Sequence, residues 1–219
     1  MKTNHRKYDY NRQAFTRTEL FFVLAGLFVI GLLVIARLGG VSNKAVRINC
    51  VNSLRQVGLA FRIWSGDQND RFPMAMLTNH QGGPLYANTD AMFRYFQVMS
   101  NELTTPMVLT CSADLRNPAT NFGTGMSSRN ISYFINLKAD ASIPDMFLCG
   151  DRSLDNGNLQ SNGTMLLSSN QHVFWWPKPM HHGNGNIAVI DGSVMQLDDS
   201  RLPSAIARNG VGITYLVFP

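Results

Sequence analysis

The feature that most constrains this chain is a run of seventeen residues, Leu20 to Ala36, without a charged or strongly polar side chain. At the helical rise of about 1.5 Å per residue, the run forms a helix roughly 25 Å long, which approaches the hydrocarbon thickness of a bilayer. Gly26 and Gly31 weaken a helix in water but are tolerated in membrane helices. The run therefore predicts a transmembrane helix over residues 20–36.

Polar residues on both sides of this run set its expected orientation. The first fourteen residues contain a single acid and four bases, which are Lys2, Arg6, Lys7 and Arg12. This positive excess favours a cytoplasmic N-terminus. Glu19 stands immediately before the run, where a carboxylate is costly unless paired, although the helix dipole compensates part of that cost. Glu19 is therefore interpreted as either a functional acid or a marker of the point where the helix enters the membrane interface.

Four residues in this region carry a family resemblance. Ala14, Phe15, Thr16 and Glu19 follow a short basic leader and precede the apolar run, an arrangement that resembles the processing signal of type IV pilins and type II secretion pseudopilins. The resemblance implies that a prepilin peptidase cleaves between Ala14 and Phe15 and methylates Phe15. It also implies that Glu19 attracts the amino terminus of a neighbouring subunit during assembly.

The C-terminal part of the chain carries a second motif of the same kind. His181 is followed by nine residues and then by Asp191 and Gly192. This H-x9-DG pattern, together with C-x-N-S-L-R-Q-V-G-L-A-F from Cys50 onward, resembles a bacterial pseudopilin-like subgroup. An Asp-Gly pair between two apolar alternating segments also predicts a β-hairpin directly. His181 is interpreted as a structural residue that forms hydrogen bonds to a loop near this hairpin.

These signals together define an expected fold and domain organisation. An apolar stripe at helical spacing predicts an amphipathic helix over residues 42–66; its members are Cys50, Leu54, Val57, Phe61 and Trp64. The predicted fold is α+β and pilin-like, with a long N-terminal helix, transmembrane plus amphipathic, packed on a small antiparallel β-sheet head. The expected domains are the leader at 1–14, the helix at 15–66 and an extracytoplasmic head at 67–219.

Cysteines and acids suggest few ligand sites. A head outside the cytoplasm allows disulfides. A Cys50–Cys111 disulfide is therefore expected, with Cys149 left unpaired. The alternative is that all three cysteines are buried or free thiols. The histidine spacing matches no zinc signature. No cofactor is expected, and Asp198 and Asp199 are weak candidates for calcium.

Charge and motifs limit the functional classes. The net charge of +5 falls to +2 without the leader, so the basicity indicates topology and no nucleic-acid partner. No nucleophile, metalloprotease or phosphate-binding motif is found, so an enzyme is not expected. The expected function is a structural pseudopilin or pilin-like subunit of a type II secretion or type IV pilus-like assembly. Its expected partners are prepilin peptidase, other pilin-like subunits through the N-terminal helix, and the inner membrane.

The resemblance implies a single-pass inner-membrane protein with a cytoplasmic N-terminus and a head in the periplasm. The alternative is a secreted or membrane-anchored extracytoplasmic binding domain that carries an ordinary signal sequence.

Overall fold

The chain forms two compact units, Met1–Lys44 and Ala45–Pro219. The computed structural model describes residues 16–79, 83–168, 170–176, 180–181 and 183–219, with the backbone alone for 34–44. The predicted leader and the predicted cleavage residues Ala14 and Phe15 lie outside the described residues.

The longest helix, α1, comprises Arg17–Asp67 and contributes to both units. Within the second unit, the predicted stripe faces the core: Cys50, Leu54, Val57 and Phe61 are fully buried, and Trp64 is partly buried. The spacing of three and four residues places these side chains on one helical face. This part of α1 is therefore amphipathic, as predicted.

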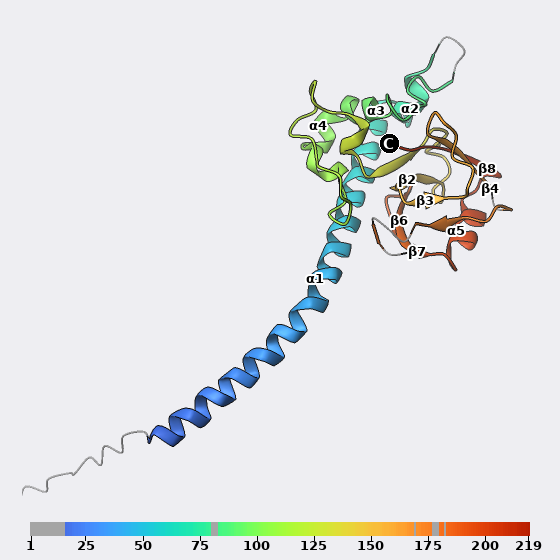
Figure 1. Cartoon of the computed structure of the whole chain (residues 1–219). Helices are drawn as coiled ribbons and strands as arrows, with labels where there is room; N and C mark the ends of the chain where they lie inside the picture. The colour runs from blue at the N-terminus through green and yellow to red at the C-terminus, as the bar shows by residue number, and fades with distance from the viewer. Residues whose placement is uncertain (1–15, 80–82, 169, 177–179, 182) are drawn as a thin grey trace, which may run out of the picture. The chain divides into compact units, whose positions relative to one another are not determined.

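The second unit (Figure 1) is organised around a six-stranded antiparallel sheet, with the strand order β4-β8-β1-β2-β6-β7. Its strands are β1 (Tyr133–Asn136), β2 (Phe147–Asp151), β4 (Thr164–Ser168), β6 (Asn184–Val189), β7 (Val194–Asp198) and β8 (Ile213–Val217). A separate two-stranded sheet pairs β3 (Leu154–Asp155) with β5 (Phe174–Trp175). The hairpin predicted from Asp191 and Gly192 is confirmed, because β6 and β7 pair in register on either side of that turn.

The sheet separates two hydrophobic cores. Because successive side chains of a strand point to opposite faces, Ile187 and Val189 of β6 lie in one core, while Ala188 and Ile190 lie in the other. The first core contains the helix α5 (Leu202–Arg208), and the second contains the buried stripe of α1. Short helices also contribute side chains to this second core. They are α2 (Pro73–Met76), α3 (Phe93–Val98), α4 (Ser100–Leu103) and the 3-10 helix η1 (Pro106–Leu109). Another 3-10 helix, η2 (Ser128–Asn130), precedes β1.

The predicted fold class is wrong in its central element. Among the described residues, no helix combines the length and the apolar character needed to cross a membrane. The expected transmembrane plus amphipathic helix does not pack as a whole on a small head: residues up to Lys44 belong to a unit of their own, and the sheet of the second unit has six strands. The physical reason lies in the apolar run. Seventeen helical residues extend about 25 Å, whereas a typical span takes about 20 residues to cross a hydrocarbon core of about 30 Å. The charged residues Glu19 and Arg37 directly flank the run, so it cannot be extended in either direction.

The expected location is corrected by the same finding. A single-pass inner-membrane protein with its head in the periplasm needs a spanning helix, and none is found in the part of the chain that the structure describes.

Candidate functional site

The first candidate region is the beginning of α1, where Thr16 and Glu19 cap the helix reciprocally. The backbone N–H and the hydroxyl of Thr16 each donate to Glu19 Oε2 at 2.9 Å, and the Glu19 N–H donates to Thr16 Oγ1 at 3.3 Å. This is a capping box, in which a Thr and a Glu three residues apart satisfy each other's backbone donors. Two hydrogen bonds lower the pKa of the Glu19 carboxyl: the one from the Thr16 backbone N–H has the larger effect, and the one from the Thr16 hydroxyl has the smaller. The lowered pKa favours the ionised form of Glu19 at the helix end.

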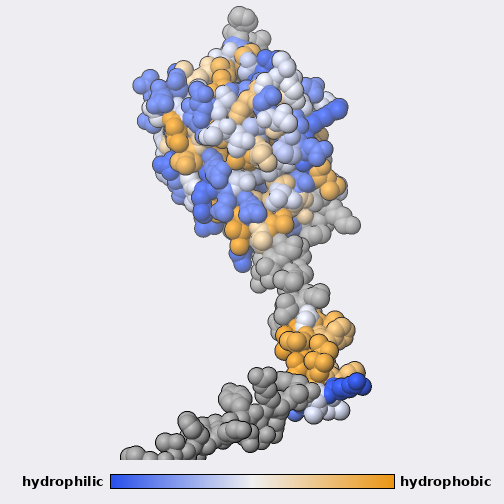
Figure 2. Space-filling model, turned by 90° about the vertical axis from the view of Figure 1, so that its left-hand side faces the viewer, coloured by the Kyte–Doolittle hydropathy of each residue, from blue (hydrophilic) through white to orange (hydrophobic). Residues whose placement is uncertain are grey.

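The turns after Glu19 expose apolar side chains on all sides of the helix. From Leu20 to Leu33, eleven large apolar side chains are at least half exposed, with Phe22 the most exposed at 77%. Figure 2 shows this stretch as a hydrophobic surface (orange) beside hydrophilic residues. A helix that is apolar all round is normally buried by neighbours, so this surface lacks a covering within the described chain.

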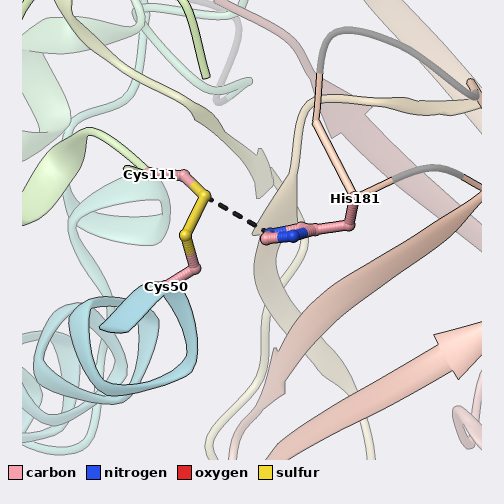
Figure 3. Close-up of side chains that lie close together, drawn as sticks. All are labelled: Cys50, Cys111 and His181. Carbon is pink, nitrogen blue, oxygen red and sulfur yellow. Dashed lines mark hydrogen bonds between the residues drawn. A yellow bond between two sulfur atoms is a disulfide. The ribbon is translucent and has the colours of Figure 1, made fainter. Parts of the chain in front are cut away.

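The second candidate region surrounds His181 in the core of the second unit. The structure joins Cys50 of α1 to Cys111, which follows η1, in a disulfide, with the Cα atoms 5.0 Å apart (Figure 3). His181 Nε2 lies 3.3 Å from Cys111 Sγ. Because a disulfide sulfur carries no hydrogen, Nε2 is the donor in this contact. The H-x9-DG histidine is thus a buried residue packed against the Cys50–Cys111 disulfide.

Asp151, at the end of β2, forms the polar side of this region. Its Oδ2 lies 3.6 Å from His181 Nε2 and accepts hydrogen bonds from the backbone N–H and the side-chain amide of Asn186 at 2.7 and 2.8 Å. Its other oxygen, Oδ1, is buried and has no hydrogen-bond partner among the described residues. Burial raises the pKa of Asp151 to about 7, although the hydrogen bonds from Asn186 act in the opposite direction. A buried carboxylate with a free oxygen is costly unless it has a further partner.

The other half of the motif, Asp191 and Gly192, lies at the far end of β6. The Asp191 side chain accepts a hydrogen bond from the Ser193 N–H at 2.7 Å, and Gly192 has a φ of +91°, which favours glycine. Arg62 of α1 donates from Nη1 to the Asp191 carbonyl at 2.6 Å. The turn is thus held against the same helix that carries Cys50.

The structure therefore separates His181 from Asp191 and gives the motif an architectural role. β6 contains six residues, about 20 Å of strand, and Cys50 and Arg62 are twelve residues apart, about 18 Å along α1. One end of β6 meets α1 through His181 and the disulfide, and the other end meets it through Arg62. The motif fixes β6 along α1 at two points.

The two calcium candidates accept hydrogen bonds from other residues of the chain. Asp198 accepts hydrogen bonds from the Ser200 hydroxyl and the Arg201 N–H, and Asp199 Oδ1 accepts one from the Trp175 N–H at 2.8 Å. Neither acid belongs to a group of three ligating side chains in the described part of the chain. Cys149, the remaining cysteine, is buried, and burial raises its pKa.

Sequence reasoning missed two acids near the disulfide. Asp151 lies beside His181, and Asp114 accepts from Arg152 Nε and Nη2 at 2.7 and 2.8 Å and from the Ser132 hydroxyl. Burial acts to raise the pKa of Asp114, but the bidentate Arg152 and the other donors outweigh it and lower the pKa. The pairing of β1 and β2 brings Ser132 and Arg152 close to the loop of Cys111, and no local signal marks such a long-range contact.

Comparison with known proteins adds no further assignment. The chain matches no protein-family model, no curated protein and no solved structure.

Proposed function

We propose that this chain is a structural subunit that associates with copies of itself and with other pilin-like subunits through the first part of α1. The motif around Ala14, Phe15 and Glu19 favours a type II secretion or type IV pilus-like assembly. Prepilin peptidase would cleave before Phe15. The observation that carries the proposal is the apolar surface of Leu20 to Leu33, which nothing in the described chain covers.

The distribution of this surface favours several helical neighbours over a single one. Consecutive residues of a helix point in directions about 100° apart, so exposed Leu20, Phe21, Phe22, Val23 and Leu24 cover the full circumference. A bundle of like helices covers such a cylinder from all sides. Each large apolar side chain that leaves water on association contributes about 1.5–3 kcal/mol.

Charged residues at the start of α1 support an association in which neighbouring helices are aligned at their N-terminal ends. Arg17 and Glu19 lie in the first turn of α1, and the lowered pKa of Glu19 favours its ionised form. In the resembled family, a carboxylate at this position attracts the amino terminus of a neighbour. The capping box offers a second role for Glu19, because the same carboxylate orders the start of the helix.

The test separates these roles with two substitutions in the full chain. Two differently tagged copies are co-expressed with a prepilin peptidase, cross-linked, and recovered through one tag, and the N-terminus of the product is sequenced. We expect a product that begins at Phe15 and self-association that is lost in both Glu19→Ala and Glu19→Gln. Gln replaces Glu in a capping box but carries no charge. If Glu19→Gln assembled normally, the charge of Glu19 would not be needed for assembly, and its role would be limited to capping the helix.

A second pair of variants tests the apolar surface. Leu24 and Leu59 are 56% and 53% exposed on the same helix, but Leu59 lies in the second unit. Leu24→Glu removes one apolar contact and places a charge in the bundle, so self-association should weaken by about tenfold or more. Leu59→Glu should leave it unchanged. Equal effects of the two substitutions would contradict the proposed surface.

A further inference from the structure

Three side chains with metal-ligating atoms converge in the core of the second unit (Figure 3). They are Cys50 from α1, Cys111 from the loop after η1, and His181 from the segment before β6. All three are buried, and their ligand atoms lie within 4.8 Å of one another. Because 61 residues separate the two cysteines and 70 separate Cys111 from His181, sequence spacing contains no sign of this group.

The distances suit a tetrahedral thiophilic cation once the disulfide is reduced. Zinc binds cysteine sulfur at about 2.3 Å and imidazole nitrogen at about 2.0–2.1 Å, which places a bound sulfur and nitrogen about 3.6 Å apart. Cys111 Sγ and His181 Nε2 are already 3.3 Å apart. Two zinc-bound sulfurs lie about 3.8 Å apart, so the sulfurs of a disulfide, about 2.05 Å long, need to separate by less than 2 Å.

A buried carboxylate lies beside the same group. Asp151 is completely buried, its Oδ2 lies 3.6 Å from His181 Nε2, and its Oδ1 has no partner among the described residues. Buried carboxylates normally pair with a donor or coordinate a metal. Asp151 places a carboxylate beside His181, outside the group of three ligating side chains.

We propose that reduction of the Cys50–Cys111 disulfide converts this group into a binding site for Zn²⁺. A dithiol reductant donates two electrons: its own two S–H groups become a disulfide, and Cys50 and Cys111 become thiols. Zn²⁺ then displaces the two thiol protons and binds both thiolates and His181 Nε2, while the imidazole proton resides on Nδ1. The disulfide and the metal use the same sulfurs, so the two states exclude each other.

An access route lies beside His181. A cavity of about 180 Å³ is lined by His181, Asn184, Gly185 and Asn186 from the segment around β6. Arg47, Gln196, Asp198 and Arg201 line the remainder. The cavity offers water and a small ion a path to the imidazole, although its two arginines slow the approach of a cation.

The experiment compares the oxidised and reduced full chain. The protein is reduced with a dithiol, freed of the reductant without oxygen, and titrated with Co²⁺ as a spectroscopic probe and then with Zn²⁺. We expect thiolate-to-cobalt charge-transfer absorption that saturates at one ion per reduced chain and is displaced by Zn²⁺. The oxidised chain should show no such absorption. A reduced chain without this absorption would overturn the proposal.

Variants and a mapping measurement identify the ligands. Cys111→Ser and His181→Ala should weaken Zn²⁺ binding at least tenfold, whereas Cys149→Ser, which removes the third cysteine, should bind as the native chain does. If the ligand variants fail to fold, alkylation of the reduced native chain with mass mapping decides the question. Zn²⁺ should protect Cys50 and Cys111 from alkylation, and equal labelling with and without Zn²⁺ would refute the site.

Discussion

Removal of the Cys50–Cys111 disulfide should destabilise the second unit by several kilocalories per mole. The bridge closes a loop with a sequence separation of 61 residues. The loop-entropy relation assigns a cross-link of this span about 4 kcal/mol at 25 °C, because it restricts the unfolded chain. Domains are stable by only about 5–15 kcal/mol, so the loss is a large fraction of the total.

The assay is urea unfolding of the full chain, followed by tryptophan fluorescence because Trp175 is almost fully buried. Three samples are compared with the native protein: the double variant Cys50→Ala/Cys111→Ala, the native chain in a reductant, and Cys149→Ala. The first two should lose about 4 kcal/mol, equivalent to roughly 8–16 °C in Tm. Cys149→Ala loses a buried sulfur but no cross-link, and it should cost about 1 kcal/mol.

Two results would refute this reasoning. The first is a double variant no less stable than Cys149→Ala, which would mean that the cross-link adds nothing beyond packing. The second is a urea midpoint of the native chain that a reductant leaves unchanged. A larger m-value in the reduced samples would support the account, because the unfolded chain without the loop exposes more surface.

Two further predictions concern pH and backbone geometry. The pKa of Asp114 is lowered in the folded state, so its ionised form stabilises the fold above about pH 4, and this stabilisation is lost as the pH falls through the folded-state pKa. In a plot of urea midpoint against pH, Asp114→Asn should therefore reduce the fall of the midpoint at acid pH. An unchanged fall would contradict this role of Asp114. A Cβ at Gly192 would lie 2.8 Å from Arg62 Nη1 at a φ of +91°, whereas Gly157 has a φ of +74° with nothing within 4 Å. By thermal unfolding, Gly157→Ala should therefore cost about 1 kcal/mol in strain alone. Gly192→Ala should cost about 1 kcal/mol more, because Arg62 must give up its hydrogen bond to the Asp191 carbonyl to make room for the methyl group. Equal costs would exclude the loss of that hydrogen bond as the cause.

Local patterns in the sequence predicted the local structure well. The spacing of Cys50, Leu54, Val57 and Phe61 is enough to place their side chains on one buried helical face, because helical geometry fixes which positions align. The Asp191–Gly192 turn was predictable for a similar reason, since only a few residue types adopt its backbone conformation. Each signal lies within a few residues of the structure that it specifies.

Long-range contacts account for what could not be predicted. Asp151 meets His181 only because β2 pairs with β6, and a sequence of strands does not reveal their order in a sheet. Arg62 similarly looks like one more exposed base until the hairpin turn is placed beside it. The transmembrane prediction failed for a different reason: it relied on apolarity, although the run of seventeen residues is short for a span.

The attachment of β6 to α1 at two points has a mechanical consequence. A force along the axis of α1 would load both attachments in shear, one near the covalent Cys50–Cys111 link and the other at the Arg62 hydrogen bond. Both contacts of the β6 segment are hydrogen bonds, so the strand can separate from α1 at either end, whereas the loop of Cys111 stays joined to α1 through the disulfide. Under tension, the loop of Cys111 would therefore remain with α1 after the hairpin has moved away from it.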